Sequence, residues 1–142
     1  MDWFKNLGGK RPKYGNKRVE YNGEKFDSKR ELNRYLYLLQ AQREGKISNL
    51  ERQVRFELLP PVLEEYEVQL KTKTVTKTRT KQRAVTYACD FRYVKDNETI
   101  VEDVKSSPSQ TTQDKGYVLR KKMMLALKGI EVKEVYKSND EI

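Results

Sequence analysis

Residues 87–105 read YACDFRYVKDNETIVEDVK, and the rest of the chain is organised around them. Two runs rich in β-branched and aromatic residues, 84–95 and 99–105, flank the polar break Asp96-Asn97-Glu98. Runs of this composition on either side of a short polar segment predict a β-hairpin.

Alternation along the two strands predicts which side chains meet. Successive side chains of a strand point to opposite faces. Pairing the two runs therefore brings Asp90, Asp103 and Lys105 together on one side of the sheet. The odd-numbered apolar positions of the first run are expected to share the other face and form core: Val85, Tyr87, Cys89, Phe91 and Tyr93.

Two carboxylates beside a lysine have a specific chemical use. Carboxylate oxygens suit Mg²⁺ or Mn²⁺, which binds through a few acids together with substrate phosphate. Such an ion polarises a phosphoryl oxygen and lowers the pKa of a bound water. A nearby ammonium group orients that water or stabilises the charge that develops on phosphorus. The alternative is an ordinary solvated Asp-Lys pair on a strand surface.

This constellation resembles the PD-(D/E)XK nuclease superfamily. The matching residues are Asp90, the tripeptide Asp103-Val104-Lys105 and Glu31 in the upstream helix SKRELNRYL. More closely, FDSKRELNRYLYL, ISNLERQVRFEL, YACDF and VEDVK resemble a small phage-borne nuclease family of that superfamily. The resemblance covers roughly residues 20–135. Cys89 stands where the motif has proline.

The resemblance implies a metal-dependent DNA endonuclease with Mg²⁺ or Mn²⁺ as cofactor. Asp90 and Asp103 would bind the metal together with the Val104 backbone carbonyl, and Glu31 would support it directly or through water. Lys105 would assist the attacking water in an in-line hydrolysis without a covalent intermediate. The resemblance further implies branched DNA such as a Holliday junction as substrate, and a homodimer that pairs two sites for phage recombination or replication.

Composition agrees with an anionic partner. The chain has 142 residues, enough for one domain with a real core, and carries a formal charge of +9. Because it contains no histidine, His-based acid–base catalysis and His-ligated zinc are excluded. The single cysteine, Cys89, excludes an internal disulfide framework and fits a reducing compartment. No membrane span or secretion signal is visible, so we expect a cytoplasmic protein, in a bacterial host cell if it is phage-borne.

The N-terminal part is expected to combine a flexible arm, a small hairpin and a helix. Residues 1–18 are basic and broken by glycine and proline, while 19–26 contain the turn dipeptide Asn22-Gly23. A helix should begin after Ser28 and end near Glu44. Its buried stripe is expected to be Leu32, Tyr35, Leu36 and Leu39.

Several polar residues of this part have two interpretations. Glu31 completes a capping box with Ser28, which alone would explain it without a metal. Gln53, on the polar face of a strand expected over residues 53–59, either lines the site or simply faces solvent. Three basic residues of the helix either contact DNA phosphates or form a solvated face: Lys29, Arg30 and Arg34.

Residues 62–83 predict a protruding β-ribbon inserted in the domain. Basic residues occupy odd positions and threonines even ones, so the second strand should show one wholly basic face for DNA. Glu64, Glu65 and Glu67 lie upstream, so a ribbon of 64–70 with 77–84 could pair some of these charges. The alternative is a solvated low-complexity loop. The candidate DNA contacts are Lys71, Lys73, Lys77, Arg79, Lys81 and Arg83.

The C-terminal part predicts a polar loop at 106–113, a helix at about 115–128 and a last strand at 130–135. The helix should turn Tyr117, Val118, Met124 and Leu125 inward and offer Lys121 and Lys122 to DNA. Residues 137–142 are expected to be a polar tail.

The expected fold is therefore α+β: a restriction-endonuclease-like αβββαβ core within one domain, 19–136. Its mixed central sheet should be flanked by helices, with the N-terminal hairpin and the basic ribbon added. Two other functions remain open: a non-catalytic nucleic-acid-binding protein on a degenerate nuclease fold, and a phage factor that inhibits a host protein.

Overall fold

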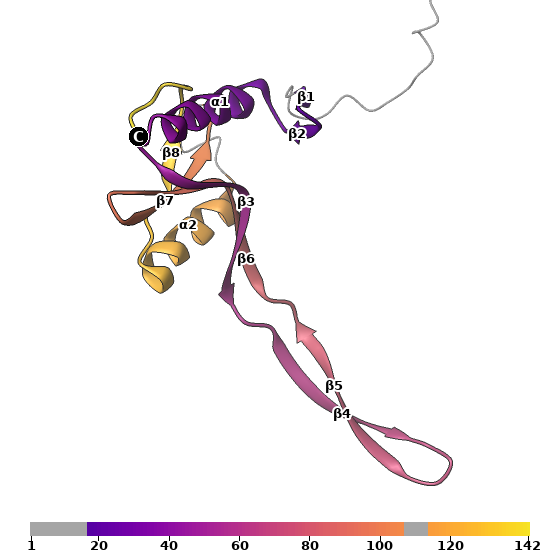
Figure 1. Cartoon of the computed structure of the whole chain (residues 1–142). Coiled ribbons are helices and arrows are strands. Elements are labelled where there is room, and N and C mark those ends of the chain that lie inside the picture. The colour runs from indigo at the N-terminus through magenta and orange to yellow at the C-terminus, as the bar shows by residue number, and fades with distance from the viewer. Residues whose placement is uncertain (1–16, 107–113) are drawn as a thin grey trace, which may run out of the picture.

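The computed structural model describes residues 17–106 and 114–142 (Figure 1). The basic arm predicted over 1–18 and the polar loop predicted over 106–113 thus lie almost wholly outside the described residues. Within the described ranges, no helix combines the length and the apolar character needed to cross a membrane.

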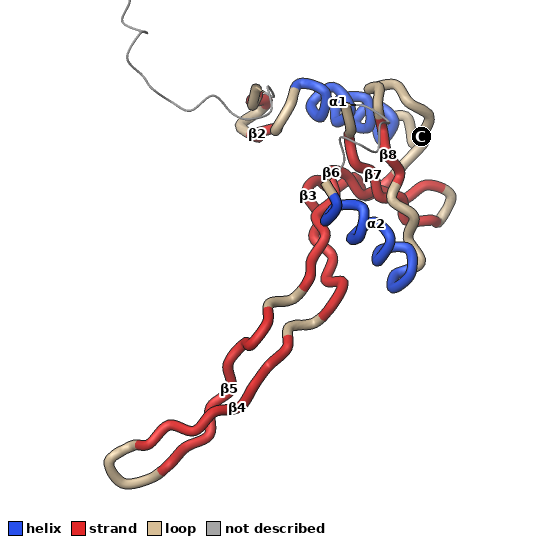
Figure 2. The backbone as a smooth tube through the Cα atoms, turned by 180° about the vertical axis from the view of Figure 1, so that it is seen from behind, coloured by secondary structure: helices blue, strands red, loops and turns tan. Residues whose placement is uncertain are grey.

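The central element is a four-stranded mixed sheet with helices on both sides, as the sequence predicts (Figures 1 and 2). The first three strands pair antiparallel in the order β3-β6-β7, and β8 joins β7 in parallel. This is an α+β fold. The core elements in chain order are α1 (Lys29–Arg43), β3 (Ser48–Leu59), β6 (Val85–Lys95), β7 (Glu98–Val104), α2 (Lys115–Lys128) and β8 (Lys133–Val135).

Two apolar clusters hold the helices to this sheet. One cluster joins α2 to the sheet and contains Leu58, Tyr87, Cys89, Val101, Tyr117, Met124 and Val132. The other joins α1 and contains Leu38, Ala41, Ile47, Phe91 and Tyr93. Burial of these side chains away from water is the main source of stability for such a layered domain.

The odd positions of β6 form core as predicted, since Tyr87, Cys89, Phe91 and Tyr93 are all buried, but they divide between the two clusters instead of sharing one. Tyr87 and Cys89 pack under α2, whereas Phe91 and Tyr93 pack under α1. The change falls around Asp90, beside which Gln53 of β3 has a left-handed backbone (φ 52°). Alternate residues of β6 thus pack against α2 before Asp90 and against α1 after it.

The first helix begins and ends as predicted, but a different stripe is buried. Ser28 caps its N-terminus by accepting the Glu31 N–H, and the helix ends before Glu44. The expected stripe residues Leu32, Tyr35, Leu36 and Leu39 are only half-buried. The buried positions are instead Glu31, Arg34, Leu38 and Ala41. Glu31 and Arg34 can be buried because each has a hydrogen-bond partner inside the fold.

In the second helix, too, the buried residues are only partly those that the sequence predicts. Asp114 caps it and Gly129, in a left-handed conformation, ends it, as predicted. Tyr117 and Met124 are buried as expected. Val118 and Leu125, also expected inside, are 47% and 52% exposed. Periodicity alone could not exclude them, because α2 carries apolar residues around most of its circumference.

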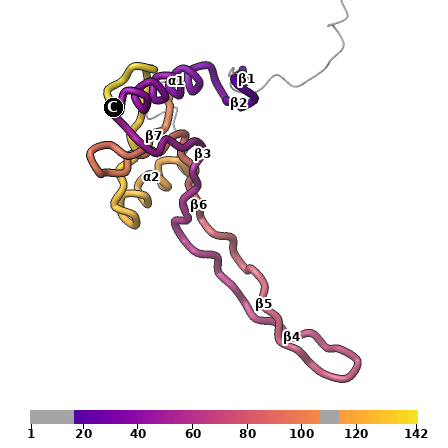
Figure 3. The backbone as a smooth tube through the Cα atoms, viewed as in Figure 1, coloured from indigo at the N-terminus to yellow at the C-terminus, as the bar shows by residue number. Residues whose placement is uncertain are grey.

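The predicted ribbon is present and projects far from the core (Figures 1 and 3). It consists of β4 (Val62–Gln69) and β5 (Thr74–Gln82), which form a separate two-stranded sheet. A small N-terminal hairpin, β1 (Val19–Tyr21) with β2 (Glu24–Phe26), is also as predicted.

The basic face of β5 is not wholly basic once β4 pairs with it, and the expected pairing of charges with the upstream glutamates is present at Glu64. Register places Glu64 opposite Arg79 and Tyr66 opposite Lys77, so acidic and aromatic side chains share the face of the basic ones. The Arg79 Nε lies 2.7 Å from a Glu64 carboxylate oxygen, and its guanidinium lies 4.5 Å from the Tyr66 ring centroid. Part of the expected positive charge is therefore compensated within the ribbon.

The expected polar tail, 137–142, is a docked segment. Arg34 donates to the backbone oxygens of Ser138 (3.0 Å) and Asp140 (2.6 Å). Lys95 donates to a backbone oxygen of Ile142, and the Ile142 side chain packs on the α1 cluster. The segment therefore belongs to the folded domain.

Candidate active site

The two aspartates meet where β6 and β7 separate. The ladder between these strands ends at the pair Phe91 and Glu102, which leaves the next backbone N–H groups without a partner on the opposite strand. The carboxylates of Asp90 and Asp103 accept hydrogen bonds from these N–H groups, each across to the other strand. Asp103 accepts from the Asp90 N–H (3.0 Å), and Asp90 accepts from the Val104 N–H (2.8 Å). The separation of the strands thus fixes both carboxylates.

Glu31 joins the aspartates from the first turn of α1. Its carboxylate accepts a 3.0 Å hydrogen bond from the Gln53 amide, and the same amide lies 3.4 Å from Asp90. Gln53 therefore links the helix acid to the strand acid while its residue remains exposed to solvent. Both sequence interpretations of Gln53 hold in part, since it borders the site and also faces water.

Lys105 completes the group from the end of β7. Its ammonium lies 3.9 Å from an Asp103 oxygen and 3.5 Å from the centroid of the Tyr117 ring. A cation held over an aromatic face gains electrostatic stabilisation while staying available to an anion. The Tyr87 hydroxyl donates to the same Asp103 oxygen at 2.5 Å. Asp103 is thus oriented by a main-chain donor, a phenol and an ammonium.

Burial disfavours the ionisation of all three acids, and neighbouring negative charge adds to this effect. Burial, followed by the negative charge of Asp90, raises the pKa of Asp103 to about 6. Burial, followed by Asp90 and Asp27, raises the pKa of Glu31 to about 7. The pKa of Asp90 is also raised by burial. Because buried carboxylates close to one another are costly to ionise, a cation bound in the site would favour their charged forms near neutral pH.

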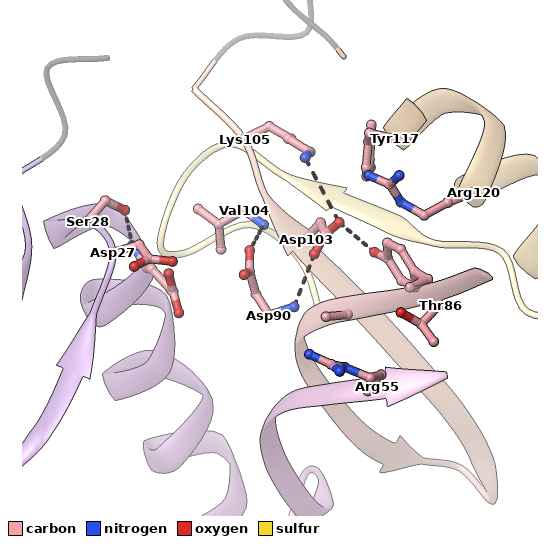
Figure 4. Close-up of a pocket in the computed structure, with 13 residues that line it drawn as sticks. Asp27, Ser28, Arg55, Thr86, Asp90, Asp103, Val104, Lys105, Tyr117 and Arg120 are labelled. Carbon is pink, nitrogen blue, oxygen red and sulfur yellow. Dashed lines mark hydrogen bonds and ion pairs between the residues drawn. The ribbon is translucent and has the colours of Figure 1, made fainter. Parts of the chain in front are cut away.

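These side chains line one open pocket of about 520 Å³ (Figure 4). Carboxylates stand at its centre, and Lys105, Arg55 and Arg120 lie around them. Such an arrangement can accept both a cation and an anionic group. The lining residues that sequence reasoning missed are Asp27, Arg55, Thr86, Tyr87, Ala88, Tyr117 and Arg120.

Most of the missed residues had no visible signal. Tyr87 was expected to be core, and it is buried, but its hydroxyl reaches Asp103. Tyr117 and Arg120 enter only because α2 packs against β3 and β6. An arginine at an exposed strand or helix position, such as Arg55, looks like any other solvated charge in the sequence.

The predicted DNA-contacting residues of α1 differ in their surroundings. Arg34 cannot contact DNA, because it is fully buried and pairs with Glu102 at 2.5 Å. Arg30 is exposed, and its guanidinium donates to three backbone oxygens: those of Lys105, Ser106 and Tyr136. Lys29 is exposed and has no ion-pair partner in the part of the chain that the structure describes.

The α2 lysines also differ. Lys121 pairs with Glu134, whereas Lys122 is exposed. Of the predicted site residues, the structure therefore brings together Glu31, Gln53, Asp90, Asp103, Val104 and Lys105. Val104 takes part through its N–H, which donates to Asp90.

The donor chemistry fits Mg²⁺ or Mn²⁺, since carboxylate and carbonyl oxygens are the ligands these ions prefer. In residues 17–106 and 114–142, no three acidic or sulfur side chains already converge as a metal-binding cluster. Asp90 and Asp103 each give an oxygen to a main-chain N–H, but each carboxylate retains further lone pairs. A divalent ion would be held by Asp90 and Asp103, with Glu31 beside them.

Fold and site together define an α+β domain with an acid–lysine pocket at the point where two central strands part. Residues 11–139 match the family described as "Protein of unknown function (DUF1064)", and the chain belongs to that family. No curated protein and no solved structure matches the chain.

Proposed function

We propose that this protein is a Mg²⁺- or Mn²⁺-dependent DNA endonuclease of the PD-(D/E)XK type. One observation carries the proposal: Glu31, the two aspartates and Lys105, distant in sequence, converge on one open pocket. Structural ion pairs rarely gather three acids whose pKa values are all raised, because such a cluster destabilises the fold. A bound cation or substrate would offset the unfavourable free energy of holding these acids together.

The residues divide the work of phosphodiester hydrolysis. A bound divalent ion supplies Lewis-acid activation and lowers the pKa of a water. Asp90 and Asp103 hold that ion, and Asp103 is itself oriented by Tyr87. Lys105, beside Asp103, stabilises charge on the phosphoryl oxygens or orients the attacking water. Glu31, with a pKa of about 7, supports the ion or accepts a proton from water.

The partner we propose is DNA, because the formal charge is +9 and basic side chains surround the acids. Branched DNA such as a Holliday junction, and a homodimer that presents two sites to it, extend the proposal. An enzyme of this kind would act in the cytoplasm of a bacterial host cell during phage recombination or replication.

The test is cleavage of junction, flap, nicked and linear duplex DNA with Mg²⁺ or Mn²⁺. Asp103→Asn should lower the cleavage rate more than about 100-fold, because it removes a metal-binding charge. Lys128→Gln, at an exposed position outside the pocket, is the matched control and should cut like wild type. If wild type and Asp103→Asn behave alike on every substrate, the proposal is wrong.

A non-catalytic nucleic-acid-binding protein is the second candidate. The observation that favours it is that no three acidic side chains of the described ranges are already arranged as a metal cluster. This candidate expects salt-sensitive binding that Asp90→Ala leaves intact or strengthens. It also expects no strand cleavage with any divalent metal.

A further inference from the structure

A second pocket of about 580 Å³ adjoins the acid pocket. The two pockets share three wall residues, Ser28, Val104 and Lys105, so they open side by side at the N-terminal end of α1. The remaining lining residues are Lys17, Val19, Lys29, Arg30 and Ser106.

The two pockets differ in charge: the first combines acids with three basic side chains, Arg55, Lys105 and Arg120, whereas the second is basic only. The first contains four carboxylates. The second is lined by four basic residues and, within the described ranges, by no acid: Lys17, Lys29, Arg30 and Lys105. A cation suits the first pocket and an anion the second. Lys105 stands in the shared wall, so an anion there lies immediately beside the acid site.

No acidic side chain of the described residues lines the second pocket to neutralise its positive charges. Lys17 and Lys29 have no ion-pair partner among the described residues. Arg30 is fixed by hydrogen bonds to three backbone oxygens, which orient its guanidinium without cancelling its charge. The pocket also lies at the start of α1, where the helix dipole adds to the attraction for an anion.

We infer that this basic pocket binds a phosphate adjacent to the scissile phosphate on the same DNA strand. The inference rests on the proposed function, which places the scissile phosphate at the acids. A strand that leaves the acid pocket over the shared wall of Ser28, Val104 and Lys105 brings its next phosphate to the basic pocket. The pocket thus helps to hold the strand with its scissile phosphate at the acids, by binding a neighbouring phosphate.

The experiment scans one phosphate at a time. The cut position is first mapped with wild type and Mg²⁺ on the best substrate. Binding is then measured in EDTA, where no cleavage occurs, to DNA carrying a single uncharged methylphosphonate at successive positions around the cut. Neutralising one phosphate next to the scissile position should weaken wild-type binding about fivefold to tenfold.

Lys29→Glu is the informative variant. It should bind unmodified DNA more weakly than wild type and should lose the sensitivity to the methylphosphonate at that one position. Folding should be preserved, because Lys29 is exposed and an acid in the first helical turn is favourable. Lys29→Gln, which removes the charge without reversing it, should show the same loss of sensitivity. Lys128→Glu has the same charge change outside both pockets and should keep the wild-type scan.

Two failures are distinguishable. If wild type cuts no DNA with any divalent metal, the proposed function is wrong and the inference falls with it. If wild type cuts DNA but the scans of wild type and both Lys29 variants coincide, the inference alone is overturned.

Discussion

Glu31 shows how one residue can satisfy two sequence interpretations through different atoms. Its backbone N–H donates to the Ser28 hydroxyl, so the helix is capped. Its carboxylate does not serve the cap but accepts from Gln53 and lies 3.6 Å from the Arg52 guanidinium. The motif S-x-x-E therefore predicts the helix start correctly, while the side chain is free for the site.

The acid site should make the metal-free protein less stable at high pH. The pKa of Glu31 is about 7 when folded, against an ordinary 4.5, so folded protein holds a proton that the unfolded chain has released. Stability therefore falls as pH rises from about 4.5 to about 7. Glu31→Gln should remove roughly 2–3 kcal/mol of this fall between pH 5 and pH 8.

The measurement is urea unfolding in EDTA across that pH range, with wild type and Glu31→Gln side by side. Adding Mg²⁺ should stabilise wild type more at pH 8 than at pH 5, because the ion competes with protons for the acids. If the free energy of unfolding of the variant depends on pH as steeply as that of wild type, Glu31 is not the cause of the loss of stability.

At the scale of elements, α1 is held to β7 by a buried ion pair. Arg34 donates two hydrogen bonds to Glu102 (2.9 and 2.5 Å), and the Tyr93 hydroxyl donates to the same carboxylate. Glu102 directly precedes Asp103, and Arg34 lies one turn after Glu31. The pair therefore fixes the distance between the helix acid and the strand acid.

Removing one partner of this pair should be severe. Arg34→Met leaves Glu102 buried without its counter-charge and should cost about 3–5 kcal/mol of unfolding free energy. The double variant Arg34→Met with Glu102→Met should be more stable than the single one, since it leaves no unpaired charge. Thermal or urea unfolding measures both. Equal loss in single and double variants would contradict the account.

Considered as a whole, the molecule is a layered domain with a separate appendage. The ribbon strands pair only with one another among the described sheets, and hydrophobic residues such as Leu63 and Leu70 stay exposed on it. An isolated two-stranded ribbon contributes little to the stability of a distant core. We therefore expect the ribbon to have a role other than stabilising the core.

Excising residues 63–80 and joining the strands by Asn-Gly should therefore leave the melting temperature within about 5 °C of wild type. If the ribbon contacts DNA backbone, the dependence of binding on log salt should become shallower by about one per lost contact. Differential scanning calorimetry and binding titrations at several salt concentrations provide the two readouts. A large drop in melting temperature would show that the ribbon supports the core.

Local signals in the sequence determined the kinds of element and their order. The Asn22-Gly23 turn, the caps at Ser28 and Asp114 and the alternation over β6 and β7 depend on residues within a few positions of one another. Asp90, Asp103 and Lys105 could be grouped in advance because strand alternation sets their side of the sheet. Such short-range rules operate before any packing occurs.

The tertiary structure alone decided which faces are buried and which charged side chains are paired within the protein. It turned Arg34 inward to Glu102, moved Tyr87 and Phe91 into different clusters, and set Glu64 against Arg79 on the ribbon. These outcomes depend on strand twist, register and partners far away in the chain. No local pattern carries that information, because a buried arginine and a solvated one are the same letter until their neighbours are placed.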